Sequence, residues 1–173
     1  MEEGLRGGQI EDKALIAIAA QFEGKRIGRI RMKRVVDASA DSLQTFIQES
    51  VEPGSRVYTD GWTGYSNLES KDYRHKVIVL SRKRKTPSDL LPCVHRVASL
   101  LKRWLMGTHQ GAISYEHLDF YLDEYVFRFN RRTSQYRGKL FYRLVQQSVQ
   151  TAPVTFSGIR QNVRGSRHEK HIR

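Results

Sequence analysis

The pattern of hydrophobic side chains at the start of the chain is typical of β-strands. Residues 13–23 are nearly continuous in apolar side chains, which predicts a buried strand. Residues 26–37 instead mix apolar positions with basic ones. The apolar members of this second segment are Ile27, Ile30, Met32 and Val35. We therefore predict a second strand with one apolar and one strongly positive face, which pairs with the first as an antiparallel hairpin.

A helical spacing follows the hairpin. Ser39 is a typical N-cap, and Pro53 with Gly54 ends the segment. The apolar side chains between them recur at helical spacing and are Leu43, Phe46, Ile47 and Val51. Residues 55–60 and 75–81 are short apolar runs, and we predict that each forms a strand.

The second half of the chain is predicted to be helical. Proline is tolerated in a first helical turn, so Pro92 places the start of a long helix within residues 88–92, and Gly107 its end. Ser114 is expected to cap the next helix, and a last helix is expected over residues 139–150. This order of elements predicts an α/β fold with an antiparallel start and a helical C-terminal half.

Length and composition indicate one globular domain. The chain has 173 residues, of which 39% are hydrophobic and 28% charged. We expect residues 1–150 to form this domain and residues 151–173 to be a basic, mostly disordered tail. No apolar run is long enough to cross a bilayer, and the acidic start is unlike a signal peptide. We therefore expect a cytoplasmic protein without a membrane partner.

The net charge of the chain indicates what class of molecule it binds. The chain carries 30 Lys and Arg against 18 Asp and Glu, a formal net charge of +12, which favours a polyanion such as nucleic acid. The basic residues fall in runs, which are residues 29–34, 82–85, 102–103 and 128–132. Aromatic side chains lie nearby and can stack on unpaired bases, namely Trp62, Tyr65, Trp104 and Tyr136. The single Cys93 excludes an internal disulfide framework and a cysteine-cluster zinc site.

Asp60 is the first candidate for chemistry. It ends a predicted strand and precedes a glycine-rich loop, which is where open α/β sheets place ligands. An Asp-Gly pair also favours a turn that has no chemical role, and local sequence alone favours this structural interpretation.

His95 and Lys102 form the second candidate. They are seven positions apart on a predicted helix, so they project in nearly the same direction beside its apolar stripe. A solvated histidine and a lysine that extends along the surface explain the same pattern without a function.

Three segments together carry a family resemblance. They are Pro53–Tyr65 (PGSRVYTDGWTGY), Leu100–His109 (LLKRWLMGTH) and Tyr121–Arg132 (YLDEYVFRFNRR). In order and spacing, from about residue 2 to residue 150, the chain resembles ISXO-type insertion-sequence transposases of the DDE superfamily. The resemblance implies an RNase H-like mixed sheet with flanking helices. It also implies DNA transposition, with metal-dependent strand cleavage and strand transfer at insertion-sequence ends. In such enzymes three side chains hold two divalent ions.

The resemblance implies roles for individual residues. Asp60 matches the second aspartate of the catalytic triad and His95 its third member, so both are expected to bind metal. Lys102 matches a helical lysine that contacts a phosphate at the transposon end. The other DNA contacts that we expect are Arg103, Trp62, Tyr65, Arg128, Asn130, Arg131 and Arg132. His95 stands where the superfamily usually has glutamate. Mg²⁺ prefers oxygen ligands and imidazole suits Mn²⁺ better, so the expected metal is Mg²⁺ or Mn²⁺.

The chain departs from the family at its start. The first aspartate is expected in a strand just before the segment that Glu2–Gly8 resembles. That place is not occupied by Glu2, Glu3, Glu11 or Asp12. We therefore expect a chain truncated at its N-terminus, without the first central strand that normally lies between the 13–23 strand and the Asp60 strand. A gap there predicts low stability and no strand cleavage by the isolated chain.

Four interpretations of function remain open from the sequence. The first is a transposase catalytic domain that is incompetent in this form. The second is a DNA-binding competitor of a full-length transposase, and the third is another RNase H-like nuclease. The fourth is a decayed reading frame whose product has no function. The expected partners are transposon ends and target DNA, together with further copies of the chain or a full-length transposase, at the bacterial nucleoid.

Overall fold

The computed structural model describes residues 14–24, 26–78, 91–110 and 113–160. The side chains of residues 137 and 159 are not described. The chain divides into two compact units, residues 1–126 and 127–173, and each is treated by itself. The acidic residues before position 13, the basic run at 82–85 and residues 161–173 lie outside the described residues.

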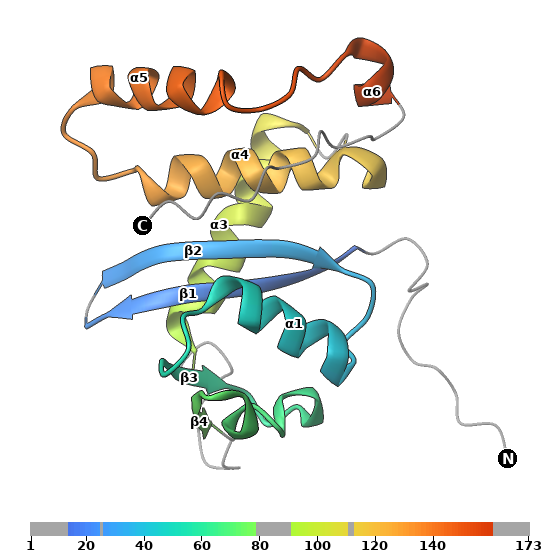
Figure 1. Cartoon of the computed structure of the whole chain (residues 1–173), viewed down its shortest axis with the longest axis vertical. Helices are drawn as coiled ribbons and strands as arrows, with labels where there is room; N and C mark the ends of the chain where they lie inside the picture. Colours follow the sequence, from blue (N-terminus) through green and yellow to red (C-terminus); the bar gives the residue numbers. More distant parts are fainter. Residues whose placement is uncertain (1–13, 25, 79–90, 111–112, 161–173) are drawn as a thin grey trace, which may run out of the picture. The chain divides into compact units, whose positions relative to one another are not determined.

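The fold is mixed α/β, with small sheets and short helices (Figure 1). In the first unit the elements are β1 (Leu15–Glu23), β2 (Arg26–Val35), α1 (Ala40–Ser50), β3 (Arg56–Thr59), β4 (Arg74–Val77), α3 (Pro92–Thr108) and the start of α4 (Leu118–Asn130). Single 3-10 turns are found at Thr63–Tyr65, Glu69–Lys71 and Tyr115–His117. Each described strand, and each helix up to α4, was predicted to within a few residues.

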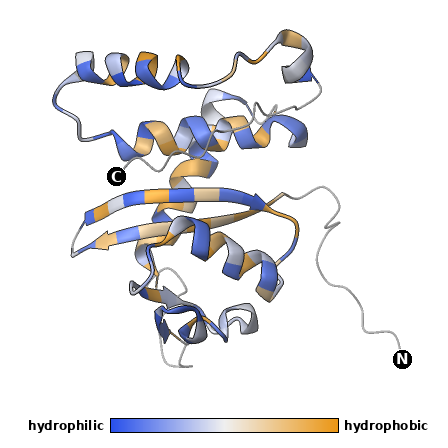
Figure 2. Ribbon diagram, in the orientation of Figure 1, coloured by the Kyte–Doolittle hydropathy of each residue, from blue (hydrophilic) through white to orange (hydrophobic). Residues whose placement is uncertain are grey.

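A β-hairpin with both faces covered organises the first unit. β1 and β2 pair antiparallel, with Ala17 opposite Lys33 and Ala20 opposite Ile30. These two pairs lie on opposite faces because side chains alternate along a strand. Ala17 belongs to a core cluster with α1, whereas Ile30 is completely buried. Helix α1 packs against both strands and α3 against β1 (Figure 1), and Figure 2 shows hydrophobic positions along β1 and α3.

The prediction of one apolar and one positive face for β2 is wrong. Ile30 and Val35 are five positions apart, so they point to opposite faces, and both are buried. Two of the basic side chains are neutralised by carboxylates from other elements. Lys33 Nζ lies 2.6 Å from Glu49 of α1, and Arg34 Nη2 lies 3.0 Å from Asp119 of α4.

Arg34 ties the hairpin to the start of α4. Its guanidinium pairs with Asp119, donates to the Tyr115 carbonyl at 3.0 Å and stacks 4.3 Å from the Tyr115 ring centroid. The Arg34 and Asp119 side chains are only 21% and 16% exposed, so the pair is screened less than a surface ion pair.

Replacement of Arg34 is therefore expected to destabilise the protein. Arg34→Met removes a charged partner from a mostly buried Asp119, and we expect a loss of about 1–3 kcal/mol in the free energy of unfolding. Arg29→Met is a matched control on the same strand, because Arg29 is exposed and surface changes usually stay within about 0.5 kcal/mol. Urea denaturation followed by circular dichroism measures both. Equal urea midpoints for the two variants would contradict a stabilising role of the Arg34 contacts with Asp119 and Tyr115.

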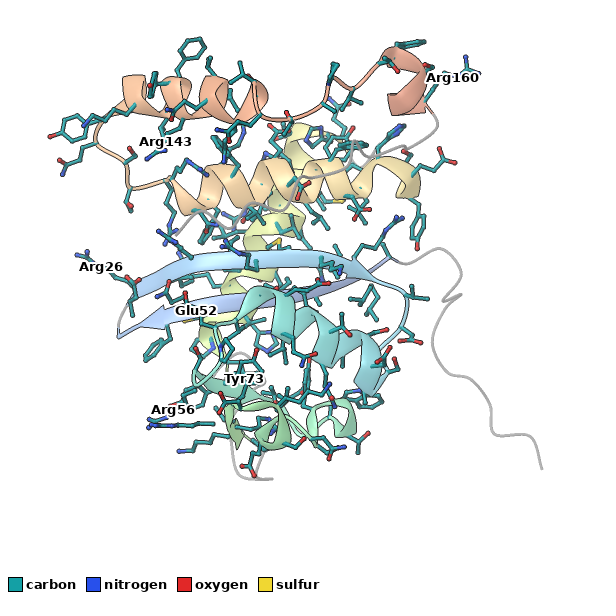
Figure 3. The ribbon with its side chains drawn as sticks, in the orientation of Figure 1. Arg26, Glu52, Arg56, Tyr73, Arg143 and Arg160 are labelled. Carbon is teal, nitrogen blue, oxygen red and sulfur yellow. The ribbon has the colours of Figure 1, made fainter. Side chains whose placement is uncertain are left out.

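β3 and β4 form a separate parallel sheet, with Arg56 opposite Arg74 and Thr59 opposite Val77. The Tyr73 hydroxyl donates to the Val51 carbonyl at 2.9 Å and links this sheet to the end of α1 (Figure 3). Within the described residues no strand joins β1 to β3, so they do not form one continuous mixed sheet. The cause proposed above, a missing central strand, stays a prediction.

The start of α1 is held by a polar cap. The Ser39 hydroxyl accepts from the Ser42 backbone N–H at 3.3 Å, as predicted for an N-cap. The Asp37 carboxylate accepts from the Ser39 backbone N–H at 3.0 Å and from the Ser42 hydroxyl at 2.7 Å. Hydrogen bonds from Ser39 and Ser42 lower the pKa of Asp37.

Loss of this cap is expected to weaken α1. We expect Ser39→Ala to lower the free energy of unfolding by about 1 kcal/mol, the usual effect of removing a serine N-cap. Ser99→Ala is the matched control, since Ser99 lies inside α3, donates to the His95 carbonyl and is exposed, and alanine is the better helix former there. Chemical denaturation that leaves Ser39→Ala as stable as Ser99→Ala would refute a stabilising cap.

The second unit contains the end of α4, then α5 (Arg137–Ser148) and α6 (Phe156–Arg160). Helix α5 matches the predicted last helix. Helix α6 was not predicted and lies within the stretch that was interpreted as a tail. The domain boundary at residue 150 stays a prediction.

Candidate functional site

Asp60 lies where β3 ends and the chain leaves the sheet. It is exposed, and its Oδ1 accepts from the Trp62 backbone N–H at 3.3 Å, which forms the turn that local sequence predicted. This turn does not use up the carboxylate, because each oxygen has further lone pairs for a second ligand. Both interpretations of Asp60 therefore agree with the structure. Its carboxylate accepts the hydrogen bond that forms the turn, and it is also exposed to solvent.

The buried Thr59, which precedes Asp60 in the chain, contacts both Asp60 and a histidine of β4. The Thr59 hydroxyl is 2.9 Å from the Asp60 carbonyl oxygen and 2.8 Å from Nε2 of His75 on β4. Since a hydroxyl has one hydrogen and Thr59 directs it to the carbonyl, His75 is the donor in the second bond. Sequence reasoning missed this pair, because only the parallel register of β3 and β4 brings residues 59 and 75 together.

The loop after Asp60 is attached to α1 at several points. Trp62 Nε1 donates to the Ala38 carbonyl at 2.9 Å, and Gln44 Nε2 donates to the Gly64 carbonyl at 3.3 Å. A Cβ on Gly64 would lie 2.9 Å from Leu43 Cδ1, so a larger residue there would require the buried Leu43 side chain to shift. These contacts fix the loop, although Trp62 remains 53% exposed.

Tyr65 is placed between the loop and the core. Its side chain packs against the core cluster of α1 and the hairpin. Burial raises the pKa of the Tyr65 hydroxyl, and repulsion by the Asp60 carboxylate raises it further. Tyr65 is thus half-buried, and its expected DNA contact stays a prediction.

His95 and Lys102 lie on α3, as predicted. The buried face of this helix carries Val97 and Leu101, whereas His95 is half-buried and both Lys102 and Arg103 are exposed. In the described part of the chain no hydrogen bond or ion pair joins Asp60 to His95 or to Lys102. Their assembly into one site is not established by these contacts.

The remaining candidates cluster at the end of α4. The Arg131 guanidinium lies 3.8 Å from the Phe127 ring centroid and Arg132 lies 4.0 Å from that of Phe129. Each arginine also donates to the carbonyl of the residue whose ring it covers. With Arg128 they line a hollow of about 260 Å³, whose other walls are Phe127, Ser134 and Leu140. Three of the residues that line this hollow are therefore arginines, and their expected DNA contacts stay a prediction.

A second histidine that the sequence did not single out is enclosed by aromatic rings. The His109 ring lies 4.7 Å from Trp104 and 4.5 Å from Tyr121, measured between centroids. Its Nε2 is buried and has no hydrogen-bond partner among the described residues. Trp104 is thereby engaged within the unit, in contrast to the exposed Trp62.

A comparison with protein families identifies the chain. The model of the ISXO2-like transposase domain matches residues 2–130. The chain belongs to this family. Membership implies a role in DNA transposition and agrees with the resemblance found in the sequence. No curated protein and no solved structure gives a significant match, so the RNase H-like form of the sheet is not confirmed by a structural relative. None of the helices in the described ranges combines the length and apolar character needed to cross a membrane.

The described side chains of this transposase domain determine whether it can hold the divalent metal expected for a DDE transposase. The family typically uses a divalent metal. Among the described residues no three His, Cys, Asp or Glu side chains converge where they could hold an ion. Asp60 supplies one carboxylate and His95 one imidazole, whereas Mg²⁺ is held mainly by oxygens. The described donors do not fit a complete metal site.

The coupling of Asp60 to Tyr65 gives a direct test of the site geometry. We expect Asp60→Asn to lower the pKa of Tyr65, because the repulsive carboxylate is lost, while burial keeps this pKa above the ordinary value near 10. Ultraviolet titration at alkaline pH measures it, as the difference between each protein and its Tyr65→Phe counterpart. A Tyr65 pKa that does not respond to Asp60→Asn would show that the two side chains are not neighbours.

Proposed function

We propose that this chain takes part in DNA strand cleavage and strand transfer at insertion-sequence ends through the surface around Asp60. The observation that carries the proposal is an exposed carboxylate at the end of β3, on a loop that α1 holds in place, within the segment that matches the transposase family. The alternative interpretation, a turn that has no chemical role, explains the hydrogen bond from Trp62 to Asp60. It does not explain why further contacts hold the whole loop against α1 and the residues before it.

The proposed roles follow the family pattern. Asp60 is the acidic ligand on the sheet, and His95 is the helical member of the site. Lys102 binds a phosphate of the transposon end, since an exposed lysine on α3 is a mobile point charge that suits this contact. The surrounding residues proposed to contact DNA are Arg103, Trp62, Tyr65, Arg128, Asn130, Arg131 and Arg132.

We further propose that the chain by itself does not cut DNA. Among the residues that the structure describes, Asp60 and His95 are too few donors for the two-ion chemistry of the family. What such a chain retains is DNA binding. The alternative role, a competitor of a full-length transposase for DNA ends or for partner subunits, follows if this retained binding has a function.

Activity assays on supercoiled plasmid separate these possibilities. We expect the purified chain to retard DNA in EDTA and to leave the plasmid intact with Mg²⁺ or Mn²⁺. Lys102→Gln is expected to weaken DNA binding several-fold and to lower the salt slope of log K by about 1, because one phosphate contact is lost. Asp60→Asn is the control, since it removes a negative charge and is expected to retain the affinity.

Two outcomes would change the assignment. Metal-dependent nicking that Asp60→Asn abolishes would show a complete active site and overturn the proposed incompetence. Cleavage of an RNA–DNA hybrid in preference to duplex DNA would favour the other RNase H-like nuclease. The source of further acidic ligands can be tested separately, by reading the genomic sequence before the Met1 codon for an in-frame acidic strand.

A further inference from the structure

Positive charge is distributed very unevenly between the two units. Residues 127–173 hold eleven of the 30 Lys and Arg residues but one of the 18 Asp and Glu residues, which is Glu169. The first unit therefore carries nineteen basic against seventeen acidic residues and is close to neutral. The described part of the second unit, residues 127–160, contains no Asp or Glu in its sequence and seven basic residues: Arg128, Arg131, Arg132, Arg137, Lys139, Arg143 and Arg160.

Most of this unit lies beyond the family match, which ends at residue 130. The charge of residues 131–173 is thus not explained by the transposase domain itself. A concentration of one sign costs self-repulsion in the folded state, and this cost is offset when a polyanion binds.

The same unit exposes large aromatic side chains. The exposed fractions are 64% for Tyr136, 70% for Phe141, 61% for Tyr142 and 78% for Phe156. Exposed aromatic rings in a segment that is rich in cations are the combination with which proteins bind unpaired nucleic acid.

Two of these rings and two cations lie near one another at the start of α5, where Tyr136 is the residue that precedes the helix. Lys139 Nζ lies 4.7 Å from the Tyr136 ring centroid, and Tyr142 and Arg143 follow Lys139 by three and four positions. Positions three and four apart are neighbours on a helix surface. Arg143, labelled in Figure 3, is exposed and its Nη1 lies 3.4 Å from Gln146 Oε1. We refer to Tyr136, Lys139, Tyr142 and Arg143 as the α5 basic face.

We propose that the α5 basic face binds an unpaired segment of DNA, with Lys139 and Arg143 at phosphates and Tyr136 and Tyr142 stacked on bases. This inference rests on the proposed function for the choice of DNA as the polyanion. An acidic protein surface would pair with the cations but would not use the two tyrosine rings in their midst.

An anionic membrane surface is the competing ligand. The opposite side of α5 exposes Phe141, Leu144 and Val145, so the helix is amphipathic. A membrane would bury this apolar side, whereas DNA would engage the α5 basic face. The two tyrosines among the cations favour DNA, because their exposed rings can stack on unpaired bases.

The experiment is fluorescence anisotropy of the full chain with a single-stranded oligonucleotide and the matching duplex, in EDTA. Lys139→Gln/Arg143→Gln is expected to lower the salt slope for the single strand by about 1–2 and to weaken binding about ten-fold or more at low salt. Arg56→Gln/Arg74→Gln removes two exposed cations from the opposed strands β3 and β4 of the first unit and is the matched control. It is expected to change binding less than two-fold.

A second pair of variants tests the stacking. Tyr136→Ala/Tyr142→Ala is expected to weaken single-strand binding about ten-fold or more and duplex binding much less, whereas Tyr136→Phe/Tyr142→Phe keeps the rings and the affinity. Circular dichroism checks that each variant is folded. Equal binding by the wild type and both α5 variants would overturn the inference, and so would variants that lose binding to anionic vesicles while they retain DNA binding.

Failure of this inference is distinguishable from failure of the proposed function. Binding that falls in Lys102→Gln but not in the α5 variants would refute the α5 basic face and leave the proposed function standing. Single-strand binding that depends on the α5 basic face, with no dependence on Lys102, would confirm the inference without support for the Asp60 surface.

Discussion

Burial of the β1–β2 hairpin on both faces is the constraint on which the first unit depends. A two-stranded ribbon is marginally stable alone in water, so it must bury its side chains against other elements. Helix α1 covers the face that carries Ala17, and α3 packs against β1. Arg34 adds a mostly buried ion pair with α4. The hairpin thereby contacts elements that are distant in the sequence, since Arg34 and Asp119 are 85 positions apart.

The candidate site is positioned through this same packing. Helix α1 is fixed by its contact with the hairpin, and the loop after Asp60 is attached to α1 by Trp62, Gln44 and the close approach at Gly64. Asp60 directly follows β3 of a short two-stranded parallel sheet, which has little stability of its own. The loop contacts therefore set the place of its carboxylate as much as the strand does.

The sequence predicted local elements better than their surroundings. Apolar periods located both strands of the hairpin and α1, and Asp60 was correctly placed at a strand end. The period could not show that β2 is covered on both faces, because Arg34 finds Asp119 only after the chain has folded back. The Thr59–His75 pair depends in the same way on the parallel register of β3 and β4. The periodicity of hydrophobic and polar residues does not show which distant side chains a polar residue will contact in the folded protein.

Separation of charge between the units gives this chain a physical division of labour. A nearly neutral first unit compacts without strong self-repulsion, although its sheets are small. The exposed cations Lys139 and Arg143 of the second unit are screened by solvent and counterions, and the proposed DNA contact would replace these counterions. Under the proposed DNA contact, part of the binding energy comes from Lys139 and Arg143, which are exposed, so their substitution leaves the buried core of the first unit unchanged. In such an arrangement affinity for DNA and stability of the transposase domain can change independently.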